Sequence, residues 1–348
     1  MFTQLPIALE QIRGWVPLGA LNPAAHTFPT DHQYLYTTAF GGDSRELAIP
    51  VRAPAALRIT LLYRMQYGNT GADYSLFFQP CADLFARFGH LVRLAPELLA
   101  AAGPIDQRCQ TYEPTPGSPV TLCESRNLAL DWPAGGLLGE LGLGGSTVLD
   151  WWLQDRRIAA LRFANPARFA GASAGNGFDL AHTVPASDYF VPALAASLQP
   201  RLGRFDGSLR RTALPLGGSI EVDVEGSARG YWFNPAQPYP SEAWHAALAL
   251  DPIEPQRLQV FSLGLSQRGA GPYVASFEFR HEGTLNRAFE DIRADGRVYC
   301  AEPLQRADAV LLQQLDAQTL QIEVRPGAGP CPAEAARAFG PGAVRYVR

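Results

Sequence analysis

Lysine is absent from the 348 residues of this chain, so all 29 basic residues are arginine. Without lysine there is no Schiff-base amine, no lysine general base and no lysine to hold the phosphates of a nucleotide. The sequence therefore excludes pyridoxal-phosphate enzymes, Walker-type NTPases and protein kinases.

Other features are missing as well. No apolar run approaches the length of about 18 residues that a membrane-spanning helix needs. The 29 basic residues face 33 acidic ones, and the net charge of −4 argues against bulk nucleic-acid binding. The motifs GxSxG, HExxH, GxGxxG and GxxxxGK(S/T) do not occur. The first fifteen residues contain no charged segment followed by an apolar one, so the protein is either cytoplasmic or has lost a signal peptide.

What is present favours β-structure. Hydrophobic residues make up 47% of the chain, which is enough for a folded core, and aromatic residues make up 10%. The 33 glycines and 29 prolines predict many turns and few long helices. Short apolar segments between turn residues fill residues 33–95 and recur regularly from about residue 205. The sequence therefore predicts a mostly β fold in two domains, at residues 1–200 and 201–348.

Two short helices interrupt this pattern. The segment PELLAAAG at residues 96–103 predicts a single helical turn or little more. The segment PASDYFVPALAASLQ predicts a second short helix whose N-terminal cap is Ser187. The regular strand–turn units that follow predict a β-sandwich or barrel for the C-terminal domain.

The five cysteines suggest disulfides. Cys109 and Cys123 bracket a loop rich in proline, glycine and serine, and Cys300 and Cys331 flank the last predicted strands. Pairing within each couple would leave Cys81 free, and the alternative is five buried thiols. None of the cysteines forms a CxxC motif, which argues against a zinc ribbon or a thioredoxin-type site. Disulfides favour an oxidising, extracytoplasmic compartment.

One short turn concentrates potential metal ligands. His26, Asp31 and His32 lie within seven residues around Pro29. Imidazole and carboxylate groups at this spacing suit a divalent metal such as zinc. The alternative is a turn that enters a strand, with Asp31 and Thr30 satisfying backbone donors.

Three stretches together resemble a known family. They are PLGALNPAAHTFPTDHQYLY, ARFGHL and PAGGLLGELGLGGSTVLDWWL, within roughly residues 15–155. They resemble the lysostaphin-type zinc endopeptidases, which cut peptidoglycan cross-bridges. The resemblance implies a duplicated hybrid motif, a fold of packed antiparallel sheets, for the N-terminal domain.

The resemblance also implies a ligand set. His26 matches the first zinc ligand of the family, and either Asp31 or His32 matches the second after an insertion in the turn. Asp150 stands where the family has its last zinc-binding histidine. A carboxylate binds zinc at about 2.0–2.2 Å, so the implied set still supplies three protein ligands.

The implied catalytic pair is incomplete. His90 in FGHL matches a catalytic histidine at a strand end, but Val148 replaces the second one. We therefore expect a zinc-dependent, hydrolase-like protein that acts on peptide or cell-wall glycopeptide material outside the cytoplasm. The alternative is a catalytically inactive binding or structural module on the same fold. Substrate, oligomeric state and the role of the C-terminal domain are left open by the sequence.

Overall fold

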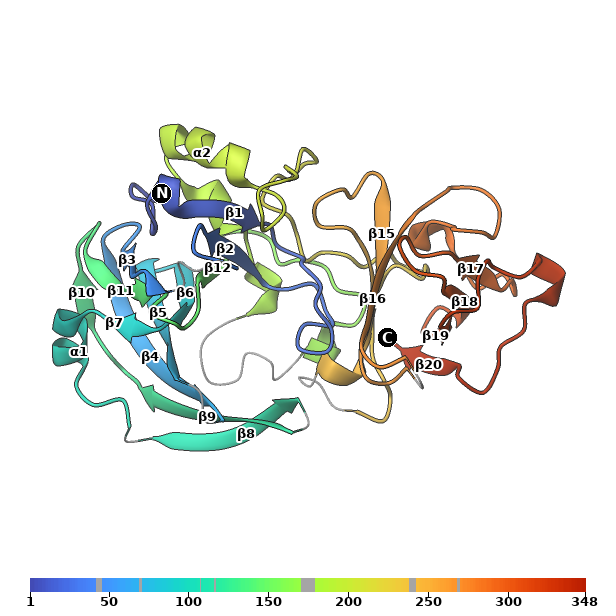
Figure 1. Cartoon of the computed structure of the whole chain (residues 1–348), viewed down its shortest axis with the longest axis horizontal. Helices are drawn as coiled ribbons and strands as arrows, with labels where there is room; N and C mark the ends of the chain where they lie inside the picture. The colour runs from blue at the N-terminus through green and yellow to red at the C-terminus, as the bar shows by residue number, and fades with distance from the viewer. Residues whose placement is uncertain are drawn as a thin grey trace. The chain divides into compact units, whose positions relative to one another are not determined.

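The computed structural model describes residues 1–41, 46–68, 71–106, 108–115, 117–169, 179–237, 242–267 and 270–348. Antiparallel sheets dominate these residues (Figure 1), which confirms the predicted mostly β fold class. No helix among the described residues is both long and apolar enough to cross a membrane.

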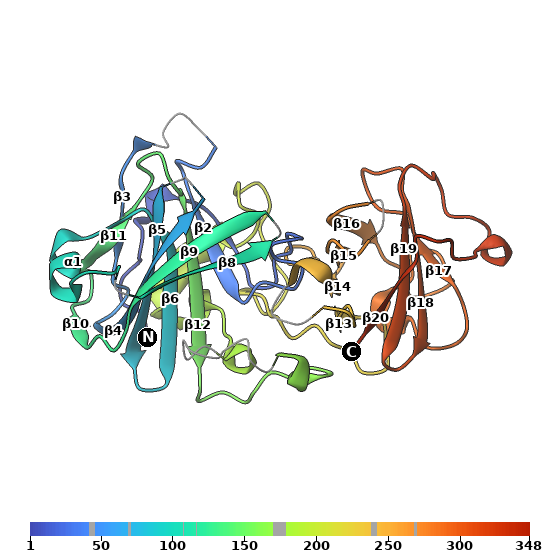
Figure 2. The same ribbon diagram turned by 90° about the horizontal axis from the view of Figure 1, so that it is seen from below.

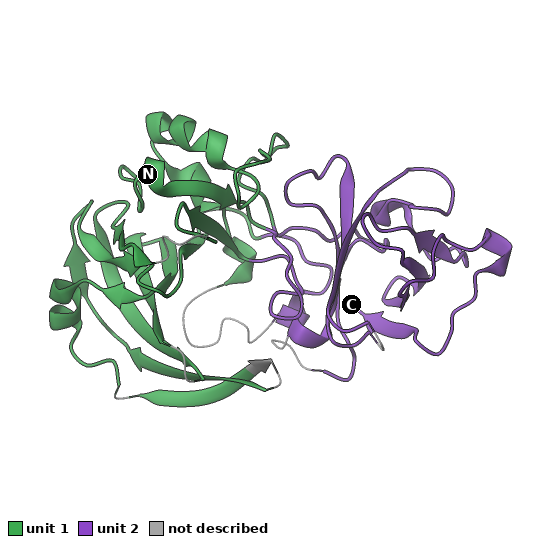
Figure 3. Ribbon diagram, viewed as in Figure 1, with its two compact units in different colours: residues 1–18, 31–160, 178–219 green, residues 19–30, 161–177, 220–348 purple. Residues whose placement is uncertain are grey.

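The chain divides into two compact units, which Figure 3 colours separately. Unit 1 contains residues 1–18, 31–160 and 178–219, and unit 2 contains residues 19–30, 161–177 and 220–348. The units are therefore not two consecutive halves of the chain. The predicted boundary after residue 200, as a division between domains that fold by themselves, stays a prediction.

Unit 1 is built on a nine-stranded antiparallel sheet and a small three-stranded sheet. The β8–β9 hairpin extends the large sheet beyond β4 (Figure 2). In spatial order the large sheet contains β1 (Ile12–Val16), β2 (His32–Thr37), β12 (Val148–Asp155), β6 (Leu84–Leu91), β5 (Ala72–Cys81), β4 (Leu57–Tyr67), β9 (Ser118–Ser125) and β8 (Cys109–Thr115), with β10 (Leu130–Trp132) paired to β4. The small sheet contains β3 (Ile49–Arg52), β11 (Leu137–Leu141) and β7 (Arg93–Leu94).

The two faces of the large sheet differ. Leu76 and Phe78 of β5 belong to the main apolar core of unit 1, whereas Phe77 belongs to a separate small cluster. Because side chains alternate along a strand, Asp73 and Ser75 share the face of Phe77. This face, opposite the main core, contains the polar residues of the candidate site.

Unit 2 contains two open four-stranded antiparallel sheets. Apolar side chains from both sheets form one core, which includes Phe261, Phe277 and Tyr346. This is the arrangement of a sandwich, and no closed barrel forms among the described residues. The sheets are β13 (Gly230–Trp232), β14 (Ala246–Leu250), β15 (Leu258–Leu263), β16 (Tyr273–Glu278) and β17 (Tyr299–Ala301), β18 (Ala309–Asp316), β19 (Thr319–Arg325), β20 (Val344–Val347).

Helices are few and short in the described part of the chain, as predicted. The helices α1 (Pro96–Ala102) and α2 (Pro192–Leu198) each begin with proline, whose fixed φ suits the first helical turn. The predicted cap was wrong, because Val191 precedes α2 and Ser187 lies upstream, where its N–H donates to Gln33 Oε1 at 3.0 Å. The 3-10 helices are η1 (Leu9–Gln11), η3 (Pro166–Phe169), η4 (Leu180–His182), η5 (Ala186–Tyr189), η6 (Gln199–Arg201), η7 (Glu242–Trp244), η8 (Phe289–Asp291) and η9 (Glu334–Ala336).

Both predicted disulfides are present. Cys109 and Cys123 lie directly opposite each other in the β8–β9 hairpin, with a Cα–Cα distance of 4.0 Å. Cys300 and Cys331 are 6.0 Å apart between Cα atoms. All five cysteines lie in the described ranges, and Cys81 is a free, exposed thiol.

Candidate functional site

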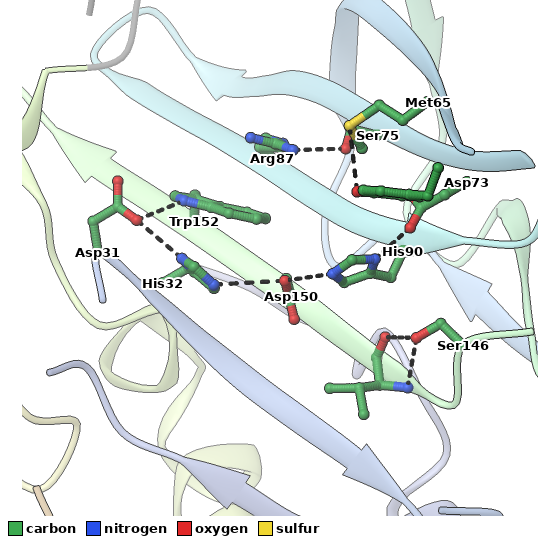
Figure 4. A network of polar contacts seen from close by, with 12 residues as sticks. Asp31, His32, Met65, Asp73, Ser75, Arg87, His90, Ser146, Asp150 and Trp152 are labelled. Carbon is green, nitrogen blue, oxygen red and sulfur yellow. Dashed lines mark hydrogen bonds and ion pairs between the residues drawn. The ribbon is translucent and has the colours of Figure 1, made fainter. Parts of the chain in front are cut away.

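Three carboxylates and two imidazoles alternate in a row across β2, β12, β6 and β5 (Figure 4). Asp31 Oδ1 lies 2.9 Å from His32 Nδ1, and His32 Nε2 lies 3.5 Å from Asp150 Oδ2. The same Asp150 oxygen lies 3.0 Å from His90 Nε2, and His90 Nδ1 hydrogen-bonds Asp73 Oδ2. We call these five residues the acid–imidazole chain.

Strand register explains how the residues of the acid–imidazole chain come together. On β12, Asp150 pairs with Gly89 of β6 on one side, and Trp152 pairs with His32 of β2 on the other. Asp150 and Trp152 are two residues apart, so their side chains lie on the same face. Trp151 between them points the other way and is fully buried in the main core.

His90 reaches this face through a β-bulge. Tyr74 of β5 pairs with Leu91, and Leu76 pairs with Phe88, so β6 has one extra residue at this point. Within the bulge His90 has φ 66°, a left-handed conformation that is uncommon outside glycine. A regular strand would point residue 90 away from the Asp150 face, and the bulge turns it back.

Gly89 provides the space beside Asp150. A Cβ at this position would lie 2.9 Å from the ring of Trp152 and 3.4 Å from Asp150 Cβ. Such a contact forces the indole to move, so glycine is needed for the observed packing.

Most of the acid–imidazole chain is shielded from solvent. The exposed fractions of His32 and Asp150 are 1% and 4%, whereas the side chain of His90 is 35% exposed. Burial alone would lower the pKa of the His90 imidazole. The charges and hydrogen bonds of Asp150 and Asp73 outweigh this effect, and the pKa of His90 is raised well above its ordinary value. Both ring nitrogens of His90 thus face carboxylate oxygens, an arrangement that favours the doubly protonated imidazolium.

Aromatic and guanidinium groups lie against the Asp31 end of the acid–imidazole chain. Trp152 Nε1 donates to Asp31 Oδ1 at 2.8 Å, and its ring lies 3.9 Å from that of His32 between centroids. The guanidinium of Arg87 lies 4.0 Å above the Trp152 ring, and its Nη2 donates to Ser75 Oγ at 2.9 Å. These contacts fix the orientation of the indole and of His32.

The structure brings together Asp31, His32, His90 and Asp150, four of the five residues that the sequence analysis selected. His26 belongs to unit 2, where its backbone pairs with Asn22. The sequence analysis missed Asp73 and Arg87 as members of the site. The signal for Asp73 was its period-two spacing with Ser75 on an apolar strand, since a polar pair at that spacing marks the face away from the core.

The implied zinc centre has a specific geometric requirement, because three donors must face one point at about 2.0–2.2 Å. No group of three or more His, Cys, Asp or Glu side chains in the described part of the chain is placed to hold a metal ion. Instead, Asp150 Oδ2 lies between the two imidazoles and contacts both (Figure 4). This arrangement does not fit a zinc centre, and zinc binding stays a prediction for metal analysis.

A pocket of about 770 Å³ adjoins the Asp73 end of the acid–imidazole chain. It is lined by the start of β5, by β7 and by residues 143–146. Tyr67 also lines it, and burial followed by the charge of Asp73 raises the pKa of this phenol. Its hydroxyl is therefore a neutral hydrogen-bonding group at neutral pH.

Comparison with models of protein families, with curated proteins and with solved structures finds no match to this chain. The resemblance to the lysostaphin-type endopeptidases therefore stands on the three sequence stretches alone and stays a prediction.

Proposed function

We propose that unit 1 binds a peptide or cell-wall glycopeptide outside the cytoplasm and does not cleave it. The observation that carries this proposal is the position of His90, whose two ring nitrogens both contact carboxylates. A general base needs an unprotonated nitrogen that reaches the reacting water. An imidazolium between Asp150 and Asp73 has no such nitrogen at neutral pH.

The position at which the resembled family has its second catalytic histidine also lacks a proton-transfer group in this chain. Val148 occupies it, opposite Tyr36 in the β2–β12 pair. An aliphatic side chain neither accepts nor donates a proton. Both positions thus favour binding over hydrolysis.

The sheet face around the acid–imidazole chain suits a ligand with flat or ring-shaped parts. Tyr34 and Tyr36 lie half-buried along β2, with 6.3 Å between ring centroids, and Trp152 and Arg87 continue the row across β12 and β6. Aromatic rings and guanidinium planes pack against peptide groups and the apolar faces of sugars. The two disulfides support an oxidising compartment for this interaction.

The test measures binding, turnover and metal content together. The full chain, with and without added zinc, is incubated with cross-linked muropeptides, followed by titration calorimetry, mass spectrometry and elemental analysis. We expect binding, unchanged muropeptide masses and no stoichiometric zinc.

A matched pair of variants identifies the opposite outcome. His281, an exposed histidine paired with Asp291 at 2.8 Å in unit 2, is the control for His90. Cleavage that is lost in His90→Ala and retained in His281→Ala would overturn the proposal in favour of a hydrolase. Zinc that is lost in His32→Ala would establish the predicted metal centre.

A further inference from the structure

Both charged and apolar residues line the pocket beside Asp73. Val92, Leu94 and Leu143 are among its apolar lining residues, and Arg93 and Glu46 contribute opposite charges. Its volume of about 770 Å³ lies within the range of small-molecule sites, about 300–1,000 Å³. The pocket therefore accommodates a short peptide or one end of a longer one.

The loop at residues 142–146 is closed by two backbone hydrogen bonds, and its residues 143–146 form a wall of this pocket. Gly142 N donates to Ser146 O at 2.7 Å, and Gly145 N donates to Gly142 O at 2.8 Å. A Cβ at Gly145 would lie 2.5 Å from Val92 Cγ1, so the loop packs directly on the strand end that leads into β7. A wall fixed in this way needs little ordering when a ligand binds.

Arg93 also lines the pocket. Its Nε donates to Glu140 Oε2 at 2.6 Å, and its Nη2 also contacts that carboxylate. The Arg93 side chain is nevertheless 59% exposed. The pairing through Nε and Nη2 orients the guanidinium and leaves Nη1 as a donor for a ligand carboxylate.

Glu46 stands at the same wall. Its Oε1 lies 3.3 Å from where a Cβ of Gly144 would be, and the next residue, Gly145, packs against Val92 beside Arg93. The Glu46 carboxylate thus lies beside the loop, and the Arg93 guanidinium lines the same pocket. The pocket lining therefore offers opposite charges to the two charged ends of a short peptide.

We propose that this pocket binds a short peptide whose two ends are both unblocked, with its free carboxylate on Arg93 and its free ammonium group on Glu46. The inference rests on the proposed function, because it assigns a subsite to the same binding module. It goes further in naming terminal charge, rather than side-chain identity, as what the pocket selects.

The experiment is a nuclear magnetic resonance titration of the full chain with three probes. The probes are trialanine, its C-terminal amide and its N-acetyl derivative. We expect trialanine to shift the amide signals of residues 142–146 and to bind about tenfold more tightly than either blocked form, since one charge-assisted contact is lost in each.

Three variants assign the charges. Arg93→Gln should bind trialanine and its amide equally, and Glu46→Gln should bind trialanine and its N-acetyl form equally. Arg58→Gln is the matched control, because Arg58 is also an exposed strand arginine in an ion pair, with Asp131 at 2.8 Å. It should behave as the unmodified chain does.

The outcomes separate this inference from the proposed function. Equal binding of the three probes, or discrimination that survives in Arg93→Gln and Glu46→Gln, overturns the inference. Muropeptide binding without any tripeptide binding overturns the inference alone. Loss of binding to both kinds of ligand overturns the proposed function as well.

Discussion

At the scale of single residues, the charge of His90 couples stability to pH. Its pKa is raised in the folded chain by Asp150 and Asp73, which outweigh the lowering effect of burial. A raised folded pKa stabilises the protein fully below the unfolded value of about 6.5. This contribution is lost as the pH rises through the folded pKa.

We therefore predict that the free energy of unfolding decreases from about pH 6.5 upward. In His90→Asn this part of the pH dependence should disappear, whereas His281→Asn should keep it. Urea unfolding followed by circular dichroism at several pH values measures the slopes. Equal slopes in the unmodified chain and in His90→Asn would show that His90 is neutral in the folded state.

The second residue-scale prediction concerns Gly89. Gly89→Ala places a methyl group 2.9 Å from the Trp152 ring, so the indole and its bond to Asp31 must shift. We expect a loss of about 1–3 kcal/mol in unfolding free energy, as for overpacking of a tight site. Gly71→Ala is the control, because a Cβ there meets nothing within 4 Å. Thermal unfolding compares the melting temperatures of the two variants. Equal melting temperatures would contradict the packing argument.

At the scale of elements, the β8–β9 hairpin depends on its disulfide. Cys109 and Cys123 form a directly opposed pair at the end of the hairpin away from its turn, and β8 lies at the edge of the sheet. An edge hairpin with one paired neighbour gains little from burial, so the cross-link contributes much of its order.

The double variant Cys109→Ser/Cys123→Ser should lower stability by about 3 kcal/mol, the value for a loop of about 15 residues. The loss should concentrate in the hairpin. Hydrogen exchange of the backbone amides of residues 109–125 should accelerate, while exchange in β12 changes little. Uniform acceleration over both elements would mean that the hairpin is part of the cooperative core.

Local features of the elements were predictable from sequence. Period-two alternation and turn residues indicate strands, and cysteines that bracket a polar loop indicate a bridge, because each depends on neighbours in sequence. The pairing of β12 between β2 and β6 depends on contacts far apart in the chain. Asp73 joined the site through such contacts, with no local signal for its partner. Likewise, His26 is six residues from His32, yet the two belong to different units.

At the scale of the whole molecule, the two units interleave along the chain. Residues 201–219 follow the predicted boundary but complete unit 1, where Leu202 joins the core and Gly217 O accepts from Leu18 N at 2.9 Å. Conversely, residues 19–30 and 161–177 belong to unit 2 although they lie between segments of unit 1. No single cut of the chain therefore separates the two units, and a cut after residue 200 leaves neither unit with all of its segments.

This interleaving predicts how truncation acts. A chain ending at residue 200 lacks the contacts of Leu202 and Gly217 in unit 1, and its residues 19–30 and 161–177 lack the rest of unit 2. We expect it to melt at least about 5 °C below the full chain, or without a cooperative transition, since the loss of several buried contacts exceeds about 2 kcal/mol. A chain ending at residue 219 restores the unit 1 contacts and should recover part of the difference. Differential scanning calorimetry of the three chains measures this order. A cooperative, full-temperature transition in the chain ending at residue 200 would instead support the predicted boundary as a true division between domains.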